Sequence, residues 1–215
     1  MNNIYNFSPG PSKLPQSVID RVENSINHYK NTGKSILEIS HRSNEFDEIL
    51  NEINNNFLNL FNFPNDVNIL LLQGGATFQN SLIPMNIDRS SKLGCFVTGT
   101  WGKKTSEDFV KIFTNLEIIE TKSNAIGQYF HKEYTGFQNT DYLHMTSNET
   151  IEGIQIQDFN SMNHENLIID MSSDLGSYKF NFDNLSYVYA GAQKNMGIPG
   201  VTICFAKDNF LIETD

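Results

Sequence analysis

A lysine between two short apolar runs is the residue of this sequence best suited to chemistry. Residues 187–189 and 201–205 are rich in β-branched and aromatic side chains, which is typical of buried strands. Lys194 lies between them, among glycines and a proline that favour a tight backbone path over a helix. A partly desolvated lysine amine loses proton affinity and can attack an aldehyde. Because an isolated loop lysine is more often an ordinary residue, this interpretation depends on other segments.

A glycine pair after another apolar run predicts a site for an anion. Residues 68–72 are typical of a buried strand, and residues 74–79, Gly-Gly-Ala-Thr-Phe-Gln, predict a turn that opens a helix. Free N–H groups at a helix N-terminus, aided by the helix dipole, favour a phosphate there. The segment lacks the ends of both the Walker loop and the dinucleotide fingerprint. Since any strand-to-helix turn can use Gly-Gly, the segment alone is equally compatible with no ligand.

Two further residues follow predicted strands. Trp101, the only tryptophan of the chain, comes after the apolar run 93–98 and is predicted to lie in a turn. Tryptophan is usually a core residue, but at the carboxyl end of a strand an indole can form a flat platform for a planar ring. Asp170 follows three aliphatic residues, and a buried carboxylate there needs a cationic or strongly donating partner. The alternative for Asp170 is a helix cap or a turn acid.

One ligand would use all four features. Pyridoxal 5'-phosphate has a phosphate, a flat ring, a ring nitrogen that must stay protonated, and an aldehyde that forms an imine with lysine. A metal site is not predicted, because the five histidines, at positions 28, 41, 131, 144 and 164, show no paired ligand spacing. A serine or cysteine triad has no nucleophile elbow to support it.

The bulk composition excludes several classes of partner. A net charge of -10, from 25 acidic and 15 basic residues, argues against nucleic acid and against an anionic membrane surface. No apolar stretch is long enough to span a membrane, and the first residues do not form a signal peptide. Cys95 and Cys204 lie inside apolar runs, where they are more consistent with reduced packing residues than with a disulfide or metal pair. These features indicate a cytoplasmic protein.

The order of segments predicts an α/β fold. Residues 1–15 form a rigid, proline-rich arm, and residues 16–215 form one large domain. Apolar spacing predicts helices over 18–29 and 43–62, the second capped by Ser43, and residues 106–113 are also helical in pattern. Strands that alternate with helices predict a mainly parallel central sheet with helices on both faces. Residues 121–140 are polar and irregular.

Six segments, in order and at similar spacing, resemble motifs of the phosphoserine aminotransferases, which are class-V, fold-type I pyridoxal-phosphate enzymes. They are residues 6–11 with Leu14-Pro15, Ser40-His-Arg-Ser43, Gly74 to Gln79, Asn148-Glu-Thr-Ile151, Asp170-Met-Ser-Ser173 and Ala190-Gly-Ala-Gln-Lys-Asn195. Gln193, where related cysteine desulfurases have a histidine, favours the aminotransferase branch. The resemblance implies the large domain of that fold, in a family that continues past the length of this sequence into a C-terminal small domain.

The resemblance also implies roles for individual residues. Lys194 would be the imine-forming lysine and proton shuttle, Asp170 the partner of the pyridinium nitrogen, and Trp101 the plate that stacks on the ring. Thr150 would bond the phenolic oxygen of the ring. The remaining implied roles are phosphate binding for Ala76, Thr77 and Gln193, and substrate binding for Arg42, His41 and the Pro9 backbone.

The implied reaction is transamination of O-phospho-L-serine with 2-oxoglutarate to 3-phosphohydroxypyruvate and L-glutamate, in serine biosynthesis. The small-molecule partners would be these substrates and products, and the full-length protein would be a homodimer. Substrate identity depends on the resemblance alone. The alternative is a truncated chain that binds the cofactor or a partner subunit without turnover.

Overall fold

The computed structural model describes residues 5–120 and 139–211. The chain divides into two compact units, residues 1–62 and residues 63–215, and each is described by itself. The division predicted from the sequence, an arm of residues 1–15 and a domain of 16–215, stays a prediction. The predicted irregular stretch 121–140 lies almost entirely outside the described residues.

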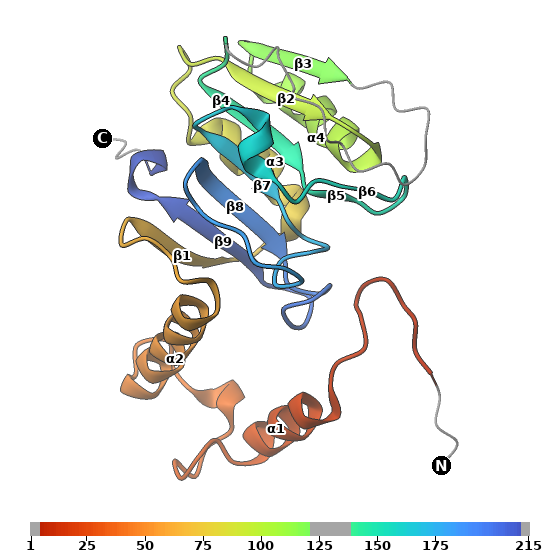
Figure 1. Cartoon of the computed structure of the whole chain (residues 1–215). Coiled ribbons are helices and arrows are strands. Elements are labelled where there is room, and N and C mark those ends of the chain that lie inside the picture. Colours follow the sequence, from red (N-terminus) through yellow and green to blue (C-terminus); the bar gives the residue numbers. More distant parts are fainter. Residues whose placement is uncertain (1–4, 121–138, 212–215) are drawn as a thin grey trace. The chain divides into compact units, whose positions relative to one another are not determined.

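The N-terminal unit consists of an extended arm, two α-helices and a short 3-10 helix in its described part (Figure 1). Its elements are α1 (Gln16–Asn27), η1 (Ile36–Glu38) and α2 (Asn44–Phe61). The hydroxyl of Ser43 accepts a hydrogen bond from the Phe46 N–H at 3.4 Å, so Ser43 is the predicted N-cap of α2. The helix ends at Phe61, and the next residue, Asn62, has a left-handed φ of 51° that stops the helical path. The helix predicted over 43–62 is therefore confirmed.

The second unit is a seven-stranded sheet in the order β1-β9-β8-β7-β4-β2-β3. Its elements, in chain order, are β1 (Val67–Leu72), α3 (Gly75–Met85), β2 (Leu93–Val97), α4 (Thr100–Ile112), β3 (Leu116–Glu120), β4 (Tyr142–Thr146), β5 (Asn148–Glu149), β6 (Ile154–Gln155), η2 (Phe159–Met162), β7 (Leu167–Asp170), β8 (Leu185–Gly191), β9 (Thr202–Lys207) and η3 (Asp208–Phe210). Strands β5 and β6 form a separate two-stranded ribbon.

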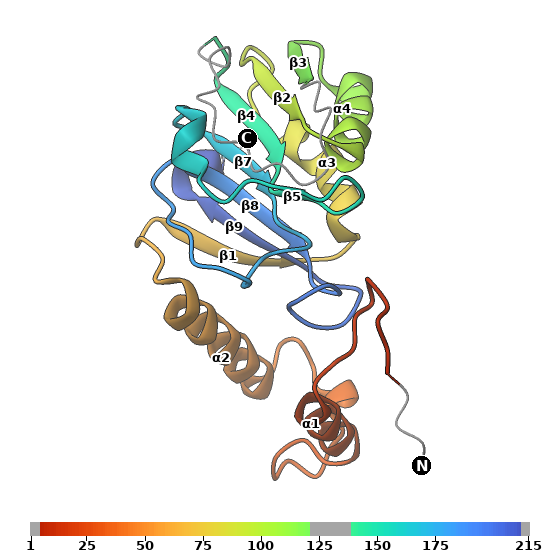
Figure 2. The ribbon, with the colours of Figure 1, turned by 45° about the vertical axis from the view of Figure 1, so that its right-hand side comes forward.

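The sheet is mixed but mostly parallel, as predicted. Strands β8, β7, β4, β2 and β3 are parallel neighbours, whereas β9 is antiparallel to both β8 and β1. Figures 1 and 2 show α3 and α4 on one face of the sheet and the short η2 on the other. The expected α/β class is therefore confirmed. Helices were expected on both faces of the sheet, but within the described part of this unit both α-helices lie on one face, and the other carries the short 3-10 helix η2.

The core lies between that face and the two helices. It is built from side chains of α3, α4 and the central strands, including Ile83, Phe109, Ile168 and both cysteines. Cys95 and Cys204 are fully buried free thiols, in agreement with their predicted packing role, and burial raises the pKa of each to about 12. Burial of this apolar surface holds the strand ends in fixed positions.

Candidate active site

Five chain segments leave the sheet at one edge. Strands β2, β4, β7 and β8 are parallel, so their carboxyl ends lie together. Strand β1 shares this direction, because it pairs antiparallel with β9, which is itself antiparallel to β8. In open α/β sheets, ligands bind at this edge. The segments that emerge there carry most of the residues predicted to bind the cofactor.

Asp170 is the last residue of β7 and is partly buried. Its Oδ1 accepts hydrogen bonds from the N–H and the hydroxyl of Ser172, at 2.8 and 2.6 Å. The pKa of Asp170 is raised to about 6, and burial is the largest cause. The Ser172 bonds and the charge of Lys194 oppose this rise, whereas the nearby Asp174 contributes to it. The donating partner predicted for this acid is therefore Ser172.

Lys194 lies, as predicted, in the connection between β8 and β9. It is half-buried and follows the Gly191 end of β8 by three residues. Its positive charge acts on the Asp170 carboxyl and lowers the pKa of that group. The two residues proposed to hold opposite ends of one ligand therefore lie at the same sheet edge, within electrostatic reach of each other.

Two serines that the sequence reasoning did not single out connect these segments. The Ser172 hydroxyl accepts a bond from the Gly191 N–H at 3.1 Å while it donates to Asp170. Ser173 accepts from the Asn148 side chain, and its carbonyl accepts from Asn195, the residue after Lys194. Both serines belong to the Asp170-Met-Ser-Ser173 motif. The motif could have indicated them, but the sequence-based prediction assigned a role only to its acid, Asp170.

Helix α3 begins as the predicted anion site requires. Gly74 and Gly75 have φ values of 95° and 67°, which an L side chain rarely adopts, and they turn the chain from β1 into the helix. Within the described residues, no side chain bonds the first-turn N–H groups, which include those of Ala76 and Thr77. These donors and the dipole can accept a phosphate.

Trp101 differs from its prediction, because it lies in the first turn of α4 rather than in a turn before the helix. The helix starts at Thr100, six residues earlier than the apolar pattern indicated. Carboxylates of Glu149 and Glu152 satisfy its first N–H groups, a long-range interaction that the local pattern does not contain. The indole is 39% exposed, and its Nε1–H donates to the Thr150 hydroxyl at 3.0 Å.

Thr150 lies on the turn that joins β5 to β6 and is exposed. Because its oxygen already accepts from Trp101, its own O–H remains able to donate to a ligand oxygen.

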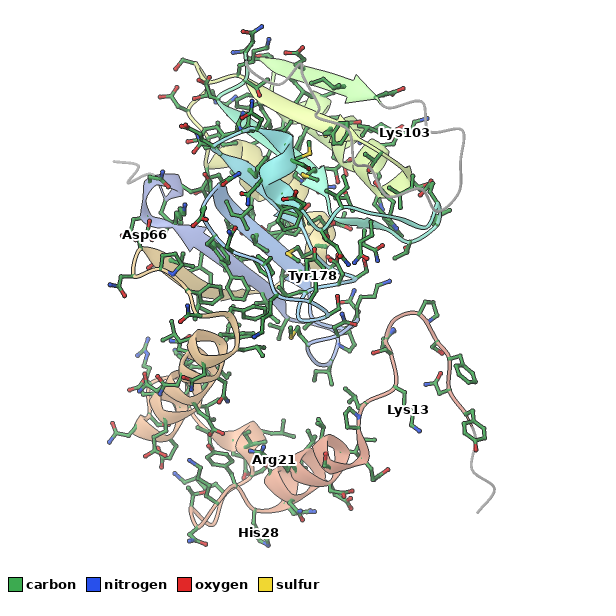
Figure 3. All side chains as sticks on the ribbon, in the orientation of Figure 1. Lys13, Arg21, His28, Asp66, Lys103 and Tyr178 are labelled. Atoms are coloured by element: carbon green, nitrogen blue, oxygen red, sulfur yellow. The ribbon has the colours of Figure 1, made fainter. Side chains whose placement is uncertain are left out.

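Gln193 is half-buried, and its side chain lies against Gly191, where an added Cβ would come within 2.7 Å of the Gln193 Oε1. Lys103, labelled in Figure 3, is exposed on α4.

The predicted substrate residues belong to the other unit. Pro9, His41 and Arg42 are exposed there, and the Arg42 N–H bonds the Ser40 hydroxyl at 3.2 Å. Because the two units are described separately, the predicted roles of these three residues stay predictions.

His144 has a structural setting in the core. It is fully buried between Tyr189, whose hydroxyl lies 3.0 Å from its Nε2, and the Cys95 thiol, 3.9 Å from its Nδ1. Burial lowers the pKa of His144 to about 3, so the ring is neutral.

Among the described residues, no group of three or more histidine, cysteine or acidic side chains could hold a metal ion. The same residues include no helix with the length and apolarity to cross a membrane.

Comparison with known proteins agrees with this geometry. The family model for class-V aminotransferases matches residues 4–214. The chain belongs to this family. A phosphoserine aminotransferase from Bacillus cereus is 38% identical over 214 residues, which are 98% of this chain and 59% of that protein. This class-V aminotransferase chain thus spans about 59% of the length of the curated relatives that it matches.

Solved structures give the same relationship. Phosphoserine aminotransferase from Bacillus circulans subsp. alkalophilus has a TM-score of 0.89 and 35% identity, covering 98% of this chain and 59% of that one. The enzyme from Trichomonas vaginalis, solved with pyridoxal phosphate bound, has a TM-score of 0.88 and 30% identity, covering 97% and 63%. The expected resemblance to phosphoserine aminotransferases and the expected fold are therefore confirmed.

Proposed function

We propose that this chain binds pyridoxal 5'-phosphate at the carboxyl edge of its sheet. The observation that carries the proposal is the position of Lys194 and Asp170 at one sheet edge, where the lysine charge acts on a carboxyl whose pKa is raised by burial. The open first turn of α3, with Ala76 and Thr77, supports a phosphate site beside that pair. These residues fit the phosphate, ring and aldehyde of the cofactor.

Other residues would complete the cofactor site. The Trp101 indole would stack on the ring, the Thr150 hydroxyl would donate to the phenolic oxygen, and Gln193 would bond the phosphate. The Asp170 carboxylate would keep the ring nitrogen protonated, because an adjacent negative charge raises the pKa of a pyridinium. When bound, the cofactor supplies an electron sink for the Cα–H bond of an amino substrate.

We propose that the complete protein transfers the amino group of O-phosphoserine to 2-oxoglutarate. The Lys194 amine would act as the proton shuttle, accepting the proton from the Cα of the substrate. Arg42 would bind the substrate carboxylate in the two-bond geometry that suits guanidinium, with His41 and the Pro9 backbone beside it. The support for this substrate is the similarity to phosphoserine aminotransferases. A homodimer and a cytoplasmic location are proposed on the same ground.

The test of cofactor binding is a titration of the 215-residue chain with pyridoxal phosphate, followed by visible absorbance. We expect a new band that disappears in Lys194→Ala and persists in Lys179→Ala, which removes an exposed lysine from the segment between β7 and β8. A band of equal intensity in Lys194→Ala would contradict the proposal.

A second candidate is a chain that binds the cofactor or a partner subunit without turnover. It is kept because the chain spans only 59% of the length of its relatives. Turnover of phosphoserine by this chain alone would support the first candidate. Binding without turnover, restored when the remaining part of a relative is supplied, would support the second.

A further inference from the structure

The first turn of α4 is closed by two carboxylates from a distant part of the chain. The Trp101 and Gly102 N–H groups donate to the two oxygens of Glu149, each at 2.8 Å. The Thr100 N–H donates to the Glu152 carboxylate at 2.9 Å. We call Glu149 and Glu152, with the three N–H groups they accept from, the α4 clamp. Each contact joins residues about 50 positions apart.

Two glycines make room for the α4 clamp. A Cβ on Gly99 would lie 2.5 Å from Glu152 Oε2 and 2.8 Å from Glu149 Cγ. A Cβ on Gly102 would lie 3.1 Å from Glu149 Oε1. Gly99 has an extended backbone, with φ of -169°, so its lack of a side chain matters for space rather than for conformation. Both glycines of the Gly99-Thr-Trp-Gly102 segment therefore serve the approach of these carboxylates.

A buried glutamate is an energetically unfavourable cap for a helix. Glu149 is fully buried, and burial raises the pKa of its carboxyl; Glu152 and Asp170 raise it too, whereas the two N–H bonds lower it. A local Ser, Thr, Asp or Asn at the N-cap would satisfy a first-turn donor without burying a carboxylate. Capping alone therefore does not explain why a glycine, Gly99, occupies the N-cap position. The contacts that Glu149 makes possible explain it better.

Glu149 links the Trp101 indole to the Thr150 hydroxyl, the two groups proposed to contact the ligand ring. Its carboxylate holds the backbone of Trp101, while the next residue in its own chain, Thr150, accepts from the indole Nε1–H at 3.0 Å. Backbone and side chain of Trp101 are therefore fixed by adjacent residues of one turn. Such a two-point contact removes rotational freedom from an indole that is 39% exposed.

We propose that the α4 clamp is a positioning device, in which Glu149 and, secondarily, Glu152 fix the Trp101 indole against Thr150 before a ligand ring binds. The device rests on the proposed function only for the identity of the ring. Its effect on Trp101 exists in the ligand-free chain and can be measured there.

The test uses Trp101 as the only tryptophan of the chain, so its fluorescence reports one site. In cofactor-free Glu149→Gln, which keeps one acceptor oxygen and loses the other, we expect a red-shifted emission and stronger quenching by acrylamide. The dissociation constant for pyridoxal phosphate should rise about tenfold, since one hydrogen bond to a charged group is lost. Glu117→Gln is the matched control, because the Glu117 carboxylate lies on β3 and forms an ion pair with Lys92 at 2.6 Å.

The outcomes separate the clamp from the cofactor site. Unchanged emission and quenching in folded Glu149→Gln would overturn the clamp, whatever happens to cofactor binding. If Glu149→Gln does not fold, Glu152→Ala removes the hydrogen bonds from the N–H and the hydroxyl of Thr100 and leaves the Glu149 bonds in place. It should give a smaller change in the same direction, and no change in that variant would also overturn the clamp. Unchanged cofactor affinity in Trp101→Leu would instead overturn the proposed role of the indole and leave the clamp standing.

Discussion

Helices α3 and α4 start at the same edge of the sheet, each after a glycine, yet their first turns are completed in opposite ways. In α3, Gly74 and Gly75 turn the chain through positive φ values, and no described side chain bonds the first-turn N–H groups. In α4, carboxylates of Glu149 and Glu152 accept from three first-turn N–H groups. One helix end is therefore open to an anion, and the other already holds two negative charges.

The difference separates residues that stabilise the chain from residues that stabilise a ligand. The α4 clamp satisfies three N–H groups at the start of the helix, of which that of Gly102 is buried, and it joins segments far apart in sequence. Both features favour the folded state. The open end of α3 and the partly buried Asp170 leave a dipole and a carboxylate without full compensation in the ligand-free chain. Unsatisfied groups of this kind are typical of binding sites, where stability is lower than it could be.

The largest expected effect comes from filling the space that the clamp occupies. Gly99→Ala should lower the free energy of unfolding by about 2 kcal/mol, because overpacking of a tight site costs on the order of 1–3 kcal/mol. The new Cβ would lie 2.5 Å from Glu152 Oε2. The measurement is urea unfolding followed by circular dichroism.

Gly102→Ala is the comparison for that experiment. Its Cβ would lie 3.1 Å from Glu149 Oε1, and alanine is favoured over glycine inside a helix by about 0.5–1 kcal/mol, so the two terms oppose each other. We expect a change near zero. Equal stability of Gly99→Ala and the parent chain would show that the α4 end is not tightly packed and would remove one side of the comparison.

The next effect comes from closing the open helix end. Thr77→Glu places a carboxylate in the first turn of α3, where the helix dipole favours it by about 0.3–1 kcal/mol. The same charge should repel the cofactor phosphate and raise the dissociation constant about tenfold, equivalent to 1.4 kcal/mol. Stability and affinity should therefore move in opposite directions, measured by urea unfolding and by absorbance titration.

The neutral variant Thr77→Gln serves as the control, because it has the same size without the charge. Any effect of replacing the threonine itself is present in both variants, so the difference between Thr77→Glu and Thr77→Gln measures the effect of the charge. If Thr77→Glu binds pyridoxal phosphate as tightly as Thr77→Gln, the phosphate does not lie at the α3 end.

The sequence predicted the parts of the fold that depend on local periodicity. The helix beginning at Ser43, the strand before Gly74 and the strand ending at Asp170 all follow apolar patterns, and the structure contains them. The start of α4 was predicted six residues too late. The first turn of α4, Thr100-Trp101-Gly102-Lys103, does not follow an apolar helical pattern. That pattern begins only after this turn, whose Trp101 N–H donates to Glu149.

The site was predicted unevenly for a related reason. Residue types with distinctive chemistry, such as Lys194 and Asp170, can be identified one at a time. Ser172 and Glu149 act only through partners at other strand ends, and their roles depend on which strands are neighbours. Serine and glutamate are common surface residues, so their positions in the chain carry no signal until the sheet order is known.

The smallest expected effect tests whether the Asp170 carboxylate, like the first turn of α3, is incompletely stabilised in the ligand-free chain. Its pKa in the folded chain, about 6, is above the ordinary value of 3.8, so the folded chain binds more protons than the unfolded chain between these pH values. The contribution of Asp170 to stability should therefore fall as the pH rises from about 4 to about 6, and this loss persists above that window. Asp170→Asn retains an Oδ1 that can accept from Ser172 but carries no charge. A rise of the pKa from 3.8 to about 6 corresponds to roughly 3 kcal/mol, and solvent screening at this partly buried carboxyl reduces the expected effect. In the ligand-free state Asp170→Asn should therefore be more stable than the parent by about 1 kcal/mol at pH 8 and equal to it below pH 4, measured by urea unfolding across that range. A variant that is less stable than the parent at pH 8 would mean that the Lys194 charge already compensates Asp170, and the carboxylate would then belong with the satisfied groups of the α4 clamp.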